Sequence, residues 1–139
     1  MALCWLGVLH LRRGDLAGAI PVLERDVRLC QAAEILTVYA WATPCLGLAY
    51  ALSGRASEAR PLLEQAVEHG AKVTGEHAWQ IGVTGEGYLL AGDSENATRL
   101  ADRSLRLSRD AEERGYEAWA LTAARRNRLA PRSSGRGPG

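Results

Sequence analysis

Residues 46–67 read LGLAYALSGRASEARPLLEQAV, and two other stretches of the chain follow the same pattern. Residues 6–27 read LGVLHLRRGDLAGAIPVLERDV, and residues 84–105 read TGEGYLLAGDSENATRLADRSL. The three stretches align without gaps, with a glycine, a ring-bearing side chain, a second glycine and a small alanine at matched places. The matched residues are Gly7, His10, Gly14 and Ala19; Gly47, Tyr50, Gly54 and Ala59; and Gly85, Tyr88, Gly92 and Ala97. Agreement at so many places in three copies indicates an internal repeat.

The repeated residue types predict a unit of two helices joined by a tight turn. Gly47 and Ala59 lack bulk, so the two helices of one unit can approach closely. Gly54 and its equivalents end the first helix, because glycine tolerates the left-handed backbone that follows a helix. Asp15 and Asp93 come directly after such glycines and can cap the next helix by accepting hydrogen bonds from its free N–H groups.

This pattern resembles that of the tetratricopeptide repeat (TPR) family, whose unit is a helix, a tight turn and a second helix. The middle stretch matches best, whereas Asp26 and Ser104 depart from the pattern at the last small position of the other two. The resemblance implies an all-α fold, a right-handed superhelical stack of antiparallel helix pairs (a TPR-like α-solenoid) with about three and a half repeats. The unit is longer than the family's usual length of about 34 residues. It resembles the long repeats found beside nucleotide-cyclase or ATPase modules in large bacterial signalling regulators.

The hydrophobic pattern divides the chain into one helical domain and a short tail. We expect the domain to span residues 1–130 and residues 131–139 to be disordered, because the tail has no apolar anchor. Helices are predicted over residues 2–13, 16–31, 35–53, 56–72, 75–91, 94–113 and 116–129. Taken in pairs, they form repeats over residues 1–33, 34–73 and 74–114, with a partial repeat over residues 115–130.

Charge and cysteine content argue against several classes of protein. The net charge is +1, and five arginines but no acidic residue follow Glu117. A nucleic-acid binder would spread its positive charge over a folded face, so no specific nucleic-acid partner is expected, and a basic tail would bind polyanions only weakly. The three cysteines have irregular spacing, which fits buried thiols in a reducing cytoplasm better than a disulfide framework.

One uncharged segment raises the question of a membrane. Residues 35–54 carry no charged side chain and are long enough to span a bilayer. Polar residues and Pro44 interrupt the segment, and charged amphipathic stretches follow it. We therefore expect a buried helix and no membrane partner.

No motif for catalysis or for cofactor or metal binding stands out. Gly82, Gly85, Gly87 and Gly92 form no phosphate-binding pattern and fall in and just after a predicted helix rather than after a strand. The cysteines and histidines lack zinc-ligand spacing, and no serine, histidine and aspartate share a nucleophile context. We predict that the chain is not an enzyme and has no catalytic, cofactor-binding or metal-binding residues.

The resemblance implies that the first helix of each pair lines a concave groove that binds a partner. By repeat position, the groove residues are Val8, Leu11 and Arg12 in the first unit; Trp41, Leu48 and Leu52 in the second; and Trp79, Glu86, Leu89 and Leu90 in the third. Arg126 and Asn127 extend this surface from the last helix. We expect the groove to bind a helical or extended protein segment. Trp41 and Trp79 either anchor that segment or pack between units, and packing is the stronger expectation for Trp5 and Trp119.

A second interpretation assumes the same fold but gives the chain a different role. In it the chain is a fragment or regulatory segment of a larger signalling enzyme, such as a nucleotide cyclase, or of an ATPase-type transcription regulator. The apolar start, MALCWLGVL, and the half unit at the other end both suggest further repeats or a homodimer formed through exposed ends.

Overall fold

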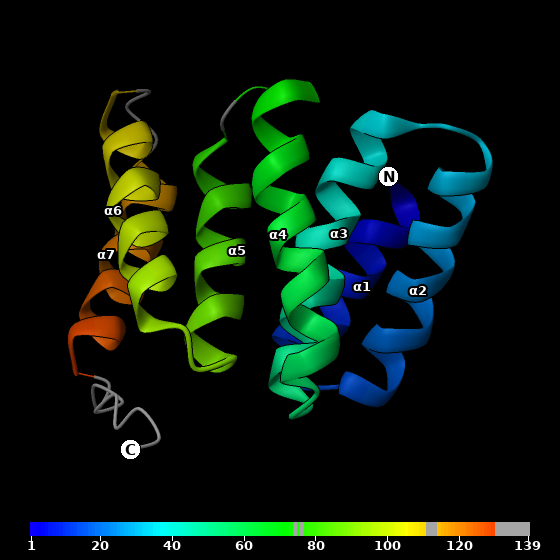
Figure 1. The fold of residues 1–139 in the computed structure, drawn as a ribbon, viewed down its shortest axis with the longest axis horizontal. Coiled ribbons are helices and arrows are strands. Elements are labelled where there is room, and N and C mark those ends of the chain that lie inside the picture. Colours follow the sequence, from blue (N-terminus) through cyan, green and yellow to red (C-terminus); the bar gives the residue numbers. More distant parts are fainter. Residues whose placement is uncertain (74, 76, 111–113, 130–139) are drawn as a thin grey trace, which may run out of the picture.

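The computed structural model describes residues 1–73, 75, 77–110 and 114–129, which form seven α-helices and no strand (Figure 1). The helices are α1 (Ala2–Arg12), α2 (Leu16–Ala32), α3 (Leu36–Leu52), α4 (Ala56–Val73), α5 (Ala78–Leu90), α6 (Ser94–Asp110) and α7 (Arg114–Leu129). The predicted all-α fold is therefore confirmed. The predicted disorder of residues 131–139 lies outside the described residues.

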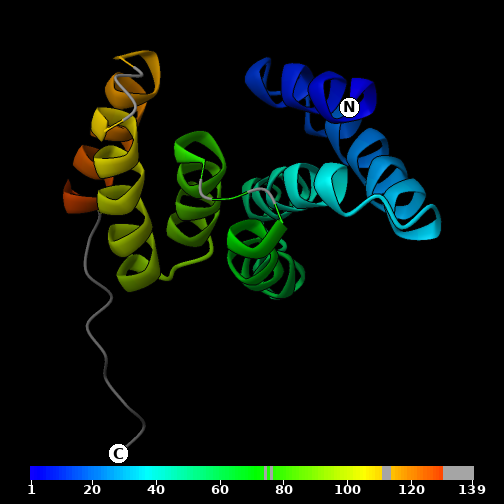
Figure 2. The same ribbon diagram turned by 90° about the horizontal axis from the view of Figure 1, so that it is seen from above.

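The helices run alternately down and up in Figure 1, so that neighbours along the chain are antiparallel. Each helix packs on the next, and α3 also contacts α1 and α5, while α5 also contacts α7. Seen from above, α1, α3 and α5 form the inner side of the molecule and α2, α4 and α6 the outer side (Figure 2). We call the inner side, together with α7, the odd-helix side. The right-handed superhelix and the number of repeats stay predictions.

The turns between the paired helices follow from the glycines and aspartates of the repeat. Gly54 and Gly92 have φ values of +80° and +86°, the left-handed region that glycine adopts without a steric penalty. The Asp15 carboxylate accepts a hydrogen bond of 2.9 Å from the Gly18 N–H at the start of α2. The Asp93 carboxylate caps α6 in the same way, accepting from the Asn96 N–H at 3.1 Å. Both predicted caps are confirmed.

The fifth helix is shorter than predicted. It begins at Ala78 instead of residue 75. Gly75 has a φ of +73°, and His77 is in an extended conformation, so neither can belong to the helix. The predicted helix over 94–113 ends at Asp110, and the remaining three residues lie outside the described part of the chain.

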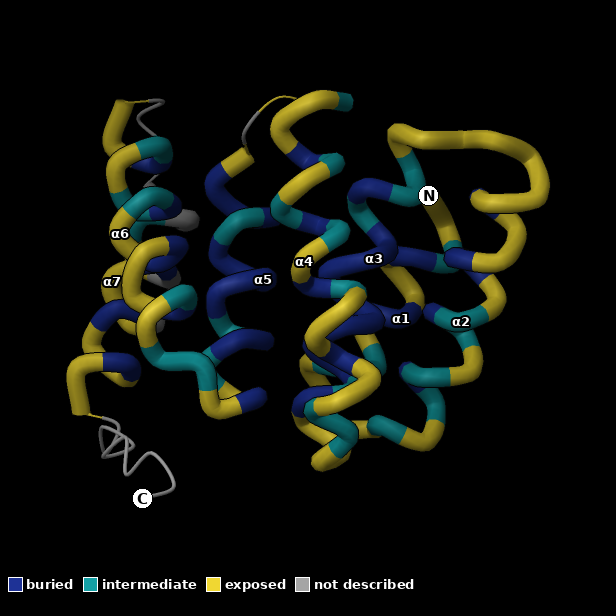
Figure 3. The backbone as a smooth tube through the Cα atoms, viewed as in Figure 1, coloured by how far each residue is buried: buried dark blue, intermediate teal, exposed yellow. Residues whose placement is uncertain are grey.

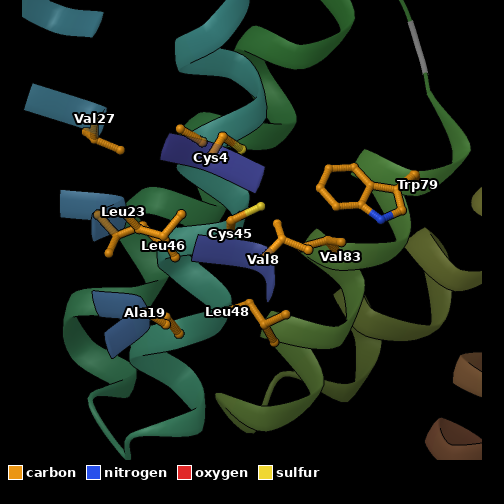
Figure 4. Close-up of a cluster of buried hydrophobic side chains, with 12 residues drawn as sticks. Cys4, Val8, Ala19, Leu23, Val27, Cys45, Leu46, Leu48, Trp79 and Val83 are labelled. Atoms are coloured by element: carbon orange, nitrogen blue, oxygen red, sulfur yellow. The ribbon is translucent and has the colours of Figure 1, made fainter. Parts of the chain in front are cut away.

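The core lies between the two sides of the molecule. Helices α3 and α5 are buried along most of their length, whereas the outer helices alternate between buried and exposed residues (Figure 3). One apolar cluster joins α1, α2, α3 and α5 (Figure 4), and a second joins α3, α4, α5 and α6. Cys4, Cys30 and Cys45 are buried in the first half of the chain and form no disulfide.

The uncharged segment over residues 35–54 becomes the buried helix α3. Its burial against α1, α2, α4 and α5 explains why it can lack charge in a folded domain. Among the helices formed by the described residues, none has the length and hydropathy needed to cross a membrane.

Candidate binding surface

A row of aromatic rings joins three helices of the odd-helix side. The Trp79 ring on α5 lies between Trp5 of α1, with ring centroids 5.7 Å apart, and Trp41 of α3, at 5.4 Å. The Trp41 and Trp79 rings are stacked, and the His77 ring centroid lies 5.0 Å from that of Trp41. Such ring pairs stabilise a contact beyond the area that they bury. We call Trp5, Trp41, Trp79 and His77 the aromatic row.

The members of this row differ in exposure. Trp79 is buried and belongs to the apolar core, and Trp41 is half-buried against it. Trp5, in contrast, is 48% exposed. Among the described indoles, Trp5 therefore has the most surface open to a partner, although packing was a stronger expectation for Trp5 than for Trp41 and Trp79. The side chain of Trp119 lies outside the described residues.

The predicted groove residues divide into three groups by exposure. Val8, Leu48 and Trp79 are buried; Leu11, Trp41, Glu86 and Leu89 are partly buried; and Arg12, Leu52 and Leu90 are exposed. The structure brings Trp41 and Trp79 together in the aromatic row and gathers Glu86, Leu89 and Leu90 around a cavity. Val8 and Leu48 contribute to the core cluster, so their side chains hold α1 and α3 in place rather than lining an open groove.

A cavity of about 130 Å³ lies between α5, α6 and α7. Its apolar lining includes Gly85, Leu89, Leu90, Ala97 and Ala101, and its polar lining consists of Glu86, Thr122, Arg126 and Asn127. This volume is comparable to that of an engineered cavity of about 150 Å³ that holds benzene. The cavity can therefore hold the end of a side chain or a small organic molecule.

Glu86 is the acidic group of this cavity. Its side chain is 26% exposed, and its carboxylate lies 3.6 Å from Nη1 of Arg126. Burial raises the pKa of Glu86 above its ordinary value, and the positive charge of Arg126 offsets part of this effect. The Arg126 side chain is 67% exposed and so remains largely hydrated.

Asn127 contributes a buried amide with an unmet acceptor. The residue is 8% exposed, and its Nδ2 donates to Oγ1 of Thr98 on α6. The Thr98 hydroxyl donates its own hydrogen to the Ser94 carbonyl at 2.8 Å, so its oxygen can only accept from Asn127. This arrangement fixes the orientation of the amide. Oδ1 of Asn127 is buried and has no hydrogen-bond partner among the described residues.

The internal repeat explains why this cavity exists. Leu23, Leu63 and Ala101 occupy the same position in the three aligned stretches, and both leucines are fully buried. A Cβ added to Gly47 would lie 2.8 Å from Leu63, so that leucine fills the space that the glycine leaves. Ala101 is too short to do the same beside Gly85, and both residues line the cavity. The alignment already shows an alanine in place of the leucine, although only the structure shows the cavity that lies beside it.

Three comparisons with known proteins give no match. No family model, curated protein or solved structure matches the chain. Within the part of the chain that the structure describes, no group of three or more His, Cys, Asp or Glu side chains is placed to hold a metal ion. The function is therefore inferred from the geometry of the odd-helix side.

Proposed function

We propose that this chain is a protein-binding module, built of TPR-like helix pairs, whose odd-helix side binds a helical or extended segment of a partner. Catalysis is not part of this role. The three buried, unpaired cysteines support a cytoplasmic setting, where thiols stay reduced.

The observation that carries the proposal is the set of exposed, large apolar side chains on the odd-numbered helices, with Trp5 near the start of α1 and Leu52 and Leu90 at the C-terminal ends of α3 and α5. Trp5, Leu52 and Leu90 are 48%, 43% and 45% exposed, and they lie on α1, α3 and α5. Large apolar side chains on one side of a helical array are typical of grooves that accept an amphipathic helix or an extended peptide. Trp5 is the best candidate for an anchor, because tryptophan is enriched among the residues that dominate binding energy.

The rigidity of this surface also supports binding. Trp79 contacts the rings of both Trp5 and Trp41, and these contacts restrict the rotamers open to the three indoles before a partner covers them. A preorganised surface binds more tightly because less ordering accompanies association.

A peptide-display selection tests the proposal. The immobilised chain is exposed to a library of short random peptides, and enriched sequences are measured individually. The double variant Leu52→Arg, Leu90→Arg places two charges on the odd-helix side at exposed positions, where folding tolerates them. The matched control is Leu29→Arg, because Leu29 is 50% exposed on the outer helix α2.

We expect the wild type and the control to bind the same apolar peptides and the double variant to lose them by at least about tenfold. Circular dichroism checks that all three chains are helical. Enrichment of no peptide by the wild type, or equal binding by the double variant, would contradict the proposal.

A further inference from the structure

The cavity between α5, α6 and α7 has a polar lining that consists almost entirely of acceptors. The Glu86 carboxylate accepts only, and Oδ1 of the buried Asn127 is an acceptor without a partner in the described residues. The Thr122 hydroxyl donates its hydrogen to the Ala118 carbonyl at 3.0 Å, which leaves its oxygen to accept. Arg126 is the cationic side chain of the described lining and already faces Glu86 from an exposed position, while the amide NH2 of Asn127 donates to Thr98.

The rest of the lining is aliphatic or small. Leu89, Leu90, Ala97 and Ala101 surround the space, and Gly82 and Gly85 add no side chain to it. A ligand that matches both parts would present hydrogen-bond donors and a positive charge at the end of a short aliphatic chain. An ammonium group supplies three donors on a compact charge, whereas its alkyl chain fills apolar volume.

Two departures from the repeat, Glu86 and Ala101, both line this cavity. Ala101 replaces the leucine of the other units, which opens the space. Glu86 stands where Val8 and Leu48 stand, and both of those side chains are buried in the core. A half-buried carboxylate is costly unless a cation or donor compensates it, and Arg126 lies at 3.6 Å and stays largely in water. Oδ1 of Asn127 therefore lacks a partner among the described residues, and the cation that faces the Glu86 carboxylate is the largely hydrated Arg126.

We propose that the cavity lined by Glu86, Ala101 and Asn127 is a binding site for a primary ammonium group on a short alkyl chain. The ammonium group pairs with the Glu86 carboxylate, donates to Asn127 and displaces Arg126 toward solvent. The chain beyond it lies against Leu89 and Leu90. The group belongs either to a small free amine or to a lysine side chain of a polypeptide. The site shares Leu90 with the proposed peptide-binding surface but includes no residue of the aromatic row. Glu86→Gln leaves Leu90 unchanged, so that variant separates a failure of this site from a failure of peptide binding.

Isothermal titration calorimetry with n-butylammonium tests the site, and n-butanol and butyrate serve as the neutral and anionic analogues. We expect a dissociation constant of about 1 mM for n-butylammonium, because so few atoms limit the affinity. Both analogues should bind at least about tenfold more weakly, since neither carries a cation for Glu86.

Three variants assign the binding to this cavity. Glu86→Gln keeps the shape and removes the charge, and it should weaken n-butylammonium binding by at least about tenfold. Ala101→Leu fills the space and should abolish binding; Glu86→Gln remains decisive if that variant does not fold. Glu95→Gln makes the same chemical change at an exposed position on α6 and should bind as the wild type does.

A lysine with both its amino and carboxyl ends blocked separates the two sources of the ammonium group. If it binds at least as tightly as n-butylammonium, a lysine side chain is the source; if only the free amine binds, the source is a small molecule. The proposal is overturned if the wild type shows no binding of n-butylammonium in the millimolar range. It is equally overturned if Glu86→Gln binds as tightly as the wild type.

Discussion

The second and third helix pairs share one repeat pattern, yet a leucine fills the space between α3 and α4 where a cavity lies at the matching position of α5 and α6. In the second pair, the fully buried Leu63 packs against Gly47 and also reaches Gly87 of α5. In the third pair, Ala101 takes the place of that leucine, and a cavity of about 130 Å³ lies beside it. A leucine at this repeat position thus accompanies a filled space in the second pair, and an alanine accompanies a cavity in the third.

The two pairs also differ in the number of polar side chains that they bury. Buried polar residues concentrate in the third pair, where Thr84, Ser104 and Ser108 each donate to a backbone carbonyl at 2.7–2.9 Å. Hydrogen-bonded groups of this kind are tolerated in a core because their desolvation is compensated. The third pair therefore depends more on hydrogen bonds and less on apolar packing than the second.

The largest expected effect on stability comes from removing the leucine side chain that fills the space between α3 and α4. Leu63→Ala should lower the free energy of unfolding by about 4 kcal/mol, because a fully buried leucine loses its contacts and leaves a cavity. Urea denaturation measures the change. Leu52→Ala, at an exposed position of α3, is the control and should change stability by less than about 0.5 kcal/mol. A loss below about 1 kcal/mol for Leu63→Ala would mean that α3, α4 and α5 are not packed around this side chain.

A pair of glycine substitutions compares the two units directly. A Cβ at position 47 would meet Leu63 at 2.8 Å, whereas one at position 85 would meet Leu100 at 3.2 Å. Overpacking costs about 1–3 kcal/mol, and replacing a helical glycine by alanine returns about 1 kcal/mol. We expect Gly47→Ala to destabilise the chain by about 1 kcal/mol and Gly85→Ala to be close to neutral. Equal losses in urea denaturation, or a larger loss at Gly85, would contradict the difference between the pairs.

The smallest effect is a pH dependence that belongs to the third pair. Burial raises the pKa of Glu86, so the folded chain binds its proton more readily than the unfolded chain does. The wild type therefore loses stability as the pH rises from the ordinary glutamate pKa of 4.5 through the higher folded value. Glu86→Gln lacks this loss, so its melting temperature relative to the wild type should be higher at pH 7 than at pH 4. The same difference at both pH values, measured by circular dichroism, would contradict the buried position of the carboxylate.

Much of the fold follows from local rules that the sequence displays. The glycine turns, the Asp15 and Asp93 caps and the order of seven helices in the described residues were all predicted, because each depends on a few neighbouring residues. The start of α5 was not predicted correctly, because the hydrophobic pattern contains no information about the positive φ of Gly75. Boundaries depend on backbone conformations that side-chain periodicity describes poorly.

The departures from the repeat acquire a physical reason only in three dimensions. Ser104 stands at a position that favours a small side chain, and its hydroxyl donates to the Ala78 carbonyl at 2.7 Å across the helix pair. Asp26, at the matching position, is buried, and its Oδ1 accepts a weak hydrogen bond from the Cys30 thiol, with Sγ 3.8 Å away. Its other carboxylate oxygen, Oδ2, has no partner in the described part of the chain. Neither contact could be predicted, because both depend on which side chain of another turn or helix lies nearby.

The candidate surface was predicted less completely than the fold. Repeat position placed Trp41, Trp79, Glu86 and Leu90 on the correct helices, and the structure gathers them into the aromatic row and the cavity. It did not predict that Trp5 would be the most exposed of the described indoles. Exposure depends on how far neighbouring helices extend over a residue, which a repeat pattern does not contain.

Amide chemical-shift mapping of the labelled chain with a display-selected peptide tests most directly which side binds a partner. Binding at the odd-helix side predicts shift changes along α1, α3 and α5, centred on Trp5, Leu52 and Leu90, with the outer faces of α2, α4 and α6 unchanged. Shift changes concentrated on the outer helices, with the Trp5 indole signal unmoved at saturation, would contradict it.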